Sequence, residues 1–371
     1  MSWREISRRW DPWMVVVALA LAAYGGLIIY SASLSTFPDG VTGLDHPVVK
    51  QGLAVALGLT LMVAVMAVPF RVWALAAPVL YGLTLVLLVM VLLVGQASLG
   101  ARRWLDLGLV QVQVSEMAKL ATVIVLARFF SQRWREMGKV GNLLLSLGLA
   151  AVPALLVMVE PDLGTAIIFG VVWVVMALIG GARPSHVGMV VALVLLSIPL
   201  TVAVALADYQ RERLALFFNP NLDPLGGGFN ILQAEIGIGA GGLWGRGLFQ
   251  GTQTQLDFLQ AASTDYAFAV LGEELGLMGA LFLLALYAFL LFRLIRAAAL
   301  AHDLFARLLV TGLAVTLLTQ VFINIGVNVR LLPVTGIPLP LVSQGGTSTV
   351  ITMVALGIAQ GVLLRRAPFN L

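Results

Sequence analysis

The sequence predicts an all-α polytopic integral membrane protein, and three observations predict it. Of the 371 residues, 60% are hydrophobic and only 11% are charged, whereas a soluble domain carries about 25% charged residues. The mean hydropathy of the chain is +1.00. The apolar residues also recur in stretches of roughly twenty, the length of helix that crosses ~30 Å of hydrocarbon. We therefore expect a single transmembrane domain over residues 1–371.

We expect ten transmembrane helices, each an apolar run long enough to cross the hydrocarbon. The predicted spans lie near residues 13–33, 51–69, 72–95, 114–130, 143–160, 164–181, 187–208, 265–292, 308–328 and 348–364. The first run follows Arg4, Arg8 and Arg9, as a signal peptide would, but it is too long and no small-residue cleavage site follows it. We therefore interpret it as the first span.

The distribution of basic residues predicts the orientation of these spans. An even number of spans places both ends of the chain on one side, and the loops on the cytoplasmic side of a membrane protein are the basic ones. With the N-terminus inside, the inner loops and flanks hold most of the Lys and Arg residues, including Arg133–Lys139 and Arg293–Arg296. Both termini are thus expected to be cytoplasmic.

The predicted outer loops are long, whereas most of the inner loops are short. The outer loops cover about 34–50, 95–113, 209–264 and 329–347. Loops longer than about 12–15 residues are usually functional or disordered. The large loop between spans seven and eight is too apolar for disorder, with residues such as Phe217, Ile231 and Trp244. We expect short helices in it, and we expect the function at the outer face.

Several kinds of site find no support in the sequence. The chain has no cysteine, which excludes disulfides, thiolate metal sites and a cysteine nucleophile. His46, His186 and His302 lie far apart, without metal-ligand spacing. The run Gly237–Gly242 resembles a dinucleotide fingerprint, but no strand precedes it in a βαβ unit. The net charge of +4 reflects topology and does not indicate nucleic-acid binding.

Two aspartates stand at predicted helix starts in the outer half. Asp265 joins the large outer loop to the eighth span, and an ionisable group at membrane depth is by default a candidate functional residue. Asp162 follows the fifth span and, with Thr165, is expected to cap the sixth and to face a cavity. Aspartate is also a favoured helix cap that complements the helix dipole. Capping alone is therefore the alternative for both residues.

Further polar residues lie at the start of the fourth span and in the loop before it. Glu116 and Lys119 are three apart, on one helical face, and form either part of a substrate cavity or a structural ion pair. Arg102 and Arg103 suit a phosphate or pyrophosphate, with lipid headgroups as the alternative. Trp104 suits a sugar face or the membrane interface. These residue types predict a polar, outward-facing cavity.

An ordered set of motifs goes further. The motifs are Ala101–Gly108, Gln113–Leu120, Pro161–Ala166, Gly251–Leu256, Thr264–Val270, Gly272–Gly276, Asn324–Gly326, Leu332–Leu341 and Ser343–Gly346. In this order, and over essentially the whole chain, the set resembles the SEDS family (shape, elongation, division and sporulation). The Gly251–Gln253 stretch ahead of Phe258 is more similar to the rod-shape members of that family than to its division members.

The resemblance implies a peptidoglycan glycosyltransferase of the bacterial cytoplasmic membrane, active at the outer face during cell elongation and rod-shape maintenance. Such an enzyme polymerises lipid II into β-1,4-linked glycan strands with inversion and releases undecaprenyl pyrophosphate. The attacking hydroxyl needs a base, and the departing pyrophosphate needs positive charge. The alternatives are a lipid II flippase and a non-catalytic scaffold for the transpeptidase. Transporters more often carry inverted repeats and broken helices near the midplane, and no repeat is evident here.

The resemblance also implies residue roles and partners. Asp265 matches the family's essential aspartate and is expected to be the base. The expected substrate-binding residues are Arg102, Arg103, Trp104, Glu116, Lys119, Asp162, Thr264 and Ser343. Among them, the basic residues would contact the phosphates, and the acidic ones would shape the cavity or hold a divalent cation such as Mg²⁺ or Mn²⁺. The expected partners are a class B penicillin-binding protein, which is a transpeptidase, and other membrane proteins of the elongation machinery.

The chain departs from the family pattern at four places. Val114 stands where a proline usually precedes Ser-Glu, and Gln260–Ser263 stands where a Pro-Glu-x-His run commonly precedes Thr-Asp. Arg330 replaces a small residue, and Gln344 replaces a tyrosine. Two of the polar groups that usually neighbour the aspartate are therefore missing.

Overall fold

The computed structural model describes residues 10–37, 40–41, 43–98, 101–106, 111–204 and 208–365. A long helix occupies each of the ten predicted stretches. These helices are α2 (Pro12–Ser33), α3 (Pro47–Ala67), α4 (Phe70–Val94), α5 (Val114–Arg133), α6 (Val140–Val159), α7 (Leu163–Ile179), α8 (Pro184–Val204), α12 (Ala267–Ala299), α13 (Leu304–Asn328) and α14 (Gly346–Leu364).

Seven helices of the described part are long and apolar enough to cross a membrane by length and composition. The other three of the ten are α5, which carries buried charges, α7, which has only 17 residues, and α8, whose apolar part is Pro184–Leu200. Ten spans therefore remain a prediction. The ends of the bundle lie together, because Gln360 Nε2 donates to the carbonyl of Asp11 at 2.6 Å. This proximity agrees with an even number of spans.

The long segments between the helices, which the sequence predicts at the outer face, contain regular structure. The large loop contains α9 (Asp208–Phe218), the 3-10 helix η2 (Pro220–Leu222), α10 (Phe229–Gly241) and α11 (Thr252–Gln255), so the expected short helices are confirmed. An all-α fold is wrong in one respect, because β1 (Gln96–Ser98), β2 (Ala101–Asp106) and β3 (Gln111–Gln113) form an antiparallel sheet in the order β1-β2-β3. Outside a helix, backbone N–H and C=O groups still need hydrogen-bond partners, and the pairing of these strands supplies them.

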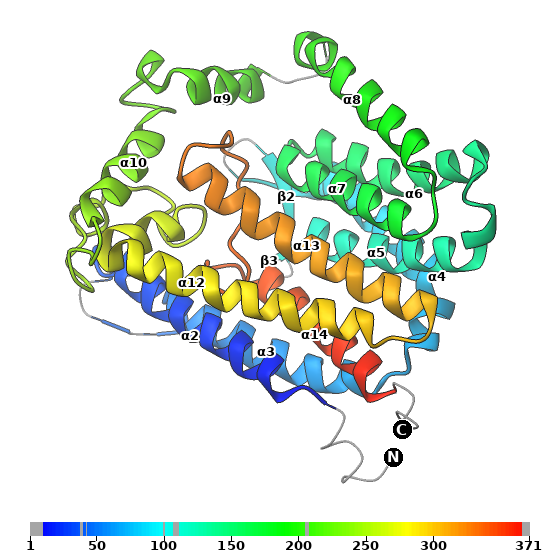
Figure 1. Ribbon diagram of the computed structural model, residues 1–371. Helices are drawn as coiled ribbons and strands as arrows, with labels where there is room; N and C mark the ends of the chain where they lie inside the picture. The colour runs from blue at the N-terminus through cyan, green and yellow to red at the C-terminus, as the bar shows by residue number, and fades with distance from the viewer. Residues whose placement is uncertain are drawn as a thin grey trace.

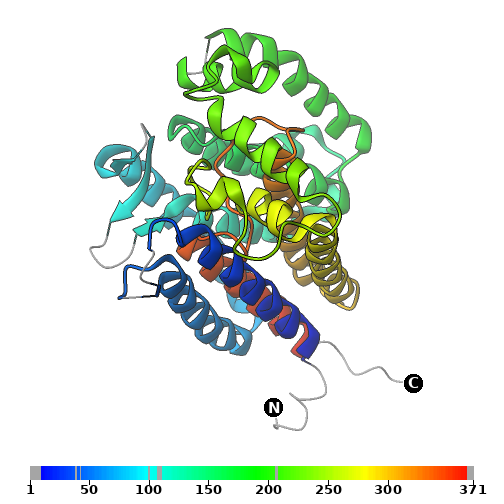
Figure 2. The ribbon, with the colours of Figure 1, turned by 90° about the vertical axis from the view of Figure 1, so that its left-hand side faces the viewer.

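Two groups of helices pack on either side of α13 (Figures 1 and 2). One group contains α2, α3, α12 and α14, and its core includes Leu21, Leu283 and Met353. The other contains α4 to α7, and its core includes Leu126 and Trp173. Helix α13 contacts α5, α7, α12 and α14, so it joins the two groups.

Helix α12 is broken near its start. Gly276 has φ 64° and ψ −161°, and a Cβ there would lie 2.3 Å from the backbone nitrogen of Gly245. The turn after α10 satisfies the backbone groups freed by the break, since Leu277 N donates to Gly242 O at 2.9 Å and Gly247 N donates to Glu274 O at 3.0 Å. This turn therefore fixes the short first part of α12, which Asp265 precedes.

Candidate functional site

Asp265 lies in the turn immediately before α12 and is half-buried. Its backbone carbonyl accepts hydrogen bonds from Asn324 Nδ2 at 3.1 Å and from Asn328 Nδ2 at 2.9 Å. The N-cap residue of α12 is Tyr266, and its side chain makes no capping hydrogen bond. The alternative that Asp265 serves as a helix cap is therefore wrong.

The charges of two arginines from distant elements act on the Asp265 carboxylate. Burial raises the pKa of Asp265, and the positive charges of Arg213 in α9 and Arg103 in β2 oppose that rise. Gly336 lies between the charges, because a Cβ at this glycine would be 3.7 Å from Asp265 Oδ2 and 3.4 Å from Arg103 Nη1. A side chain at 336 would narrow the space between the Asp265 carboxylate and the Arg103 guanidinium, and the φ of +75° also favours glycine there.

Arg103 is held in place by backbone carbonyls at the end of α6. Its Nε donates to the carbonyl of Glu160 at 3.1 Å, and its Nη2 donates to the carbonyl of Pro161. A cation at a helix C-terminus also complements the helix dipole. The guanidinium is therefore pre-oriented toward Asp265. The side chain of Arg102 lies outside the described part of the structure.

Asp162 caps α7, as expected. Its carboxylate accepts from Thr165 N at 3.1 Å and from Thr165 Oγ1 at 2.8 Å. Its negative charge also raises the pKa of Asp265. Asp162 therefore both caps α7 and lies close enough to Asp265 to affect its charge. Asp162 is buried, and each of its carboxylate oxygens accepts one of these two bonds.

Sequence reasoning missed two charged residues of this cluster. Arg213 lies in the charged start of α9, and its Nη1 donates to Val334 O at 3.4 Å. Glu160 is 1% exposed, and its Oε1 has no hydrogen-bond partner among the described residues. Burial and the charge of Asp162 raise the pKa of Glu160 to about 8, against the lowering effect of Arg103. The sequence could have indicated Glu160 through its position directly before the Pro161-Asp162 motif.

The raised pKa of Glu160 makes stability depend on pH. The folded protein holds this proton up to about pH 8, whereas the unfolded chain releases it near the ordinary glutamate pKa of 4.5, so stability falls as pH rises between these two values. Relative to Glu160→Gln, the wild-type Tm should therefore decline between these values in a thermal-shift series. Glu136→Gln, at an exposed carboxylate, is the control. Parallel wild-type and Glu160→Gln curves would contradict the assignment.

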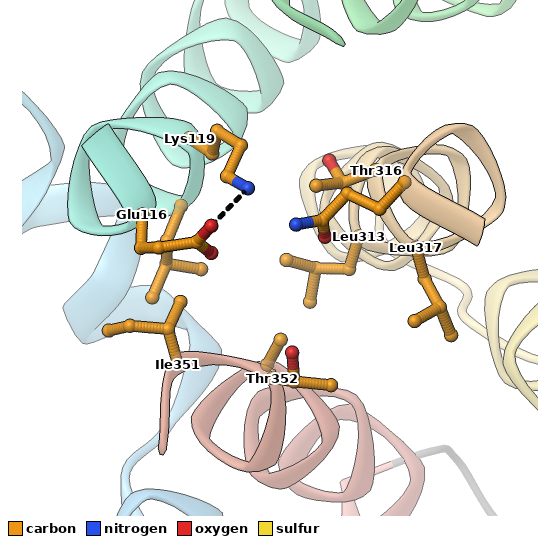
Figure 3. Close-up of a pocket in the computed structure, with 10 residues that line it drawn as sticks. Glu116, Lys119, Leu313, Thr316, Leu317, Ile351 and Thr352 are labelled. Carbon is orange, nitrogen blue, oxygen red and sulfur yellow. Dashed lines mark hydrogen bonds and ion pairs between the residues drawn. The ribbon is translucent and has the colours of Figure 1, made fainter. Parts of the chain in front are cut away.

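Glu116 and Lys119 form a buried ion pair deeper in the bundle. Lys119 Nζ lies 2.8 Å from Glu116 Oε1, and the two side chains are 3% and 4% exposed. The pair lines a cavity between α5, α13 and α14 together with Leu120, Leu313, Thr316, Leu317, Gln320, Ile351, Thr352 and Ala355 (Figure 3). Gln320 is one helical turn from Asn324 along α13, so this cavity lies beneath the Asp265 cluster and is lined by other residues.

The remaining expected substrate residues have different surroundings. Trp104 is half-buried in β2 opposite Gln113, and Thr264 Oγ1 donates to Ala261 O at 3.2 Å. Ser343 is buried, and its Oγ accepts from Leu339 N at 3.0 Å. This bond closes the last outer loop, which indicates a structural use for the Ser343 hydroxyl.

The departures from the family pattern have partners of their own. Ser263 Oγ donates to Gln344 Oε1 at 2.9 Å, and Gln344 N donates to Ser263 O at 2.8 Å. Arg330 forms an ion pair with Glu235 of α10 at 3.2 Å. The Ser263–Gln344 contacts therefore join the turn that carries Asp265 to the loop before α14.

The described residues do not fit a protein-held divalent cation. Within these ranges, no three His, Cys, Asp or Glu side chains come together as a metal site. Glu116 is neutralised by Lys119, and Asp162 bonds to Thr165. We therefore derive no step through a cation.

Comparisons with known proteins agree on the family. A protein-family model described as cell cycle protein, covering FtsW, RodA and SpoVE, matches residues 12–366. The peptidoglycan glycosyltransferase MrdB of Escherichia coli K12 is 41% identical over 357 residues, which are 96% of this chain and 94% of that protein. A probable peptidoglycan glycosyltransferase FtsW of Geobacter metallireducens is 35% identical over 378 residues, covering 98% and 97% of the two chains.

Solved structures resemble the fold over nearly its whole length. A chain from a peptidoglycan synthase complex that coordinates polymerization and crosslinking has a TM-score of 0.82 and 32% identity, with 96% of this chain and 98% of that chain covered. The rod shape determining protein RodA of Thermus thermophilus has a TM-score of 0.71 and 29% identity, with coverage of 97% and 98%. The chain therefore belongs to the FtsW/RodA/SpoVE family of cell cycle proteins, and the resemblance to the SEDS family is confirmed.

Proposed function

We propose that the chain is a peptidoglycan glycosyltransferase that polymerises lipid II during cell elongation. The observation that carries the proposal is a half-buried carboxylate, Asp265, which caps no helix and lies with Arg103 beside Gly336, within the electrostatic influence of Arg213. The names of the MrdB and RodA relatives support the same activity.

The proposed step is a single inverting displacement. The 4-hydroxyl oxygen of the acceptor GlcNAc bonds to C1 of the donor MurNAc while the bond from C1 to the phosphate oxygen breaks. Asp265 takes the hydroxyl proton, and undecaprenyl pyrophosphate leaves with the bonding electron pair. A base with a pKa above that of free aspartate holds a proton more readily at the working pH, and burial raises the pKa of Asp265 in that direction.

The two arginines suit the leaving group. Guanidinium groups bind pyrophosphate oxygens in a fork geometry, and preoriented cations stabilise negative charge that develops in a transition state. Arg103 is preoriented by two backbone carbonyls. We assign the pyrophosphate to Arg103 and Arg213. Arg102, Trp104, Thr264, Glu116 and Lys119 remain proposed substrate-binding residues.

The proposal includes the membrane arrangement and the partner. Ten spans, cytoplasmic termini and an active site at the outer face of the cytoplasmic membrane are supported by the charge bias of the loops. A class B penicillin-binding protein as partner is supported by the similar chain from a synthase complex that couples polymerization to crosslinking. Other elongation proteins complete the proposed assembly.

A lipid II flippase is the second candidate. The break in α12 at Gly276 and the buried pair Glu116–Lys119 favour it, because broken helices and intramembrane charges are common in transporters. The charges around Asp265, however, gather near the outer loops.

The two candidates predict different products from lipid II. We expect the purified wild-type chain, with its cognate transpeptidase, to convert lipid II in detergent into glycan ladders on a gel. In sealed vesicles, a flippase would instead move labelled lipid II between leaflets without lengthening it. Translocation without polymer would overturn the proposal. If neither polymer nor translocation were observed, the result would favour the scaffold.

A further inference from the structure

Asn328, in the last turn of α13, reaches into the start of α12. Its Oδ1 accepts from Ala269 N at 3.0 Å, and its Nδ2 donates to Asp265 O and to Asn324 O, each at 2.9 Å. The side chain is buried, with 3% exposure. One amide thus joins two helices that are 59 residues apart at the Ala269 contact.

The contact with Ala269 supplies a helix cap from outside the helix. The first N–H groups of a helix have no partners within it and are usually satisfied by a side chain just before the helix. Tyr266, the N-cap residue of α12, provides no such bond, and Ala269 is the third residue of α12. Ala269 N also donates to Tyr266 O at 2.9 Å, so Asn328 Oδ1 shares this N–H group and supplies the side-chain acceptor that Tyr266 does not.

Asn324 completes the arrangement. Its Nδ2 donates to Asp265 O at 3.1 Å and to Ile337 O at 2.8 Å. Ile337 follows Gly336, where a Cβ atom would lie close to both Asp265 Oδ2 and Arg103 Nη1. The two asparagines therefore hold the backbone of Asp265 and the neighbouring loop in one geometry.

We propose that Asn328 and Asn324 are positioning residues for Asp265: they hold its backbone carbonyl, and Asn328 supplies the side-chain acceptor at the start of α12, so that the aspartate carboxylate stays available to substrate. The inference rests on the proposed function, in which Asp265 is the base. A buried amide with no such role would stabilise the fold and leave the acid–base behaviour of the reaction unchanged.

Asn328→Asp separates the two parts of this role. The new carboxylate can still accept from Ala269 N, but it cannot donate to the Asp265 carbonyl, and its charge favours the protonated form of a neighbouring carboxyl. We expect kcat to fall by about 10- to 100-fold, as small displacements of catalytic groups do, with KM changed by less than about twofold. The acidic limb of the kcat–pH profile should move to higher pH.

Two further variants act as references. Asn324→Ser removes one donor to Asp265 and should lower kcat less than Asn328→Asp. Thr319→Val is the matched control, because Thr319 is also buried on α13 and its hydroxyl donates to Val315 O of its own helix at 2.8 Å. Its rate and pH profile should equal those of the wild type.

The outcomes distinguish this inference from the proposed function. An inactive Asp265→Asn together with wild-type kcat and pH profile in Asn328→Asp would overturn the positioning role and leave the base assigned. An active Asp265→Asn would overturn the base assignment itself. If Asn328→Asp does not fold, Asn324→Ser decides, because a wild-type kcat and pH profile in that variant would contradict the proposal.

Discussion

Replacing Asp265 by asparagine is expected to reduce lipid II polymerisation by about a thousandfold, within the range that a general base contributes. The amide has the same size and leaves the backbone bonds from Asn324 and Asn328 in place, but it cannot accept the hydroxyl proton at a useful rate. Folding should persist, because the substitution removes a carboxylate whose burial is unfavourable. The measurement is the initial rate of glycan synthesis, with Tm as the check on folding.

The same variant series tests the pH dependence. Burial raises the pKa of Asp265 above the ordinary value of 3.8, so its basic form is lost as pH falls through that higher value. Wild-type kcat should show an acidic limb displaced upward from that of free aspartate. Asp257→Asn is the matched control, since Asp257 is exposed in the preceding loop at φ 57°, where asparagine is tolerated. Equal rates for Asp265→Asn and Asp257→Asn would remove Asp265 from the mechanism.

Lys119→Met is expected to destabilise the protein by about 3–5 kcal/mol, the usual cost of leaving a buried charge without its partner. Glu116 is 4% exposed on its side chain and would lose its ion pair. The double variant Glu116→Gln with Lys119→Met removes both charges and should recover most of that loss. Unfolding in denaturing detergent measures the difference, with Lys139→Met, at an exposed pair, as a control that should leave stability unchanged.

The double variant also decides what the pair does. If Glu116 and Lys119 only join turns of α5, the stable double variant should polymerise lipid II like the wild type. If the cavity beneath Asp265 binds part of the substrate, the double variant should fold normally yet lose activity. A double variant as unstable as Lys119→Met alone would contradict the ion-pair argument.

Local properties of the chain predicted many of its elements. Apolar runs of membrane-crossing length indicated all ten long helices, since helix formation in lipid depends on the segment itself. The position of Asp162 after Pro161 predicted the α7 cap, which the bond to Thr165 N confirms. The segment 95–113 was misread as irregular, because its short strands have a weak pattern and pair only with each other.

The sequence by itself determined the membrane class, the family and the identity of Asp265 as the principal candidate residue, because these follow from hydrophobic length and ordered motifs. Only the tertiary structure decided what surrounds Asp265. The charges of Arg103 and Arg213 act on its carboxylate from two separate elements, and Asn328 bonds its backbone carbonyl from a third. Lipid-facing and protein-facing helix surfaces are equally apolar, so which helices meet is decided by packing.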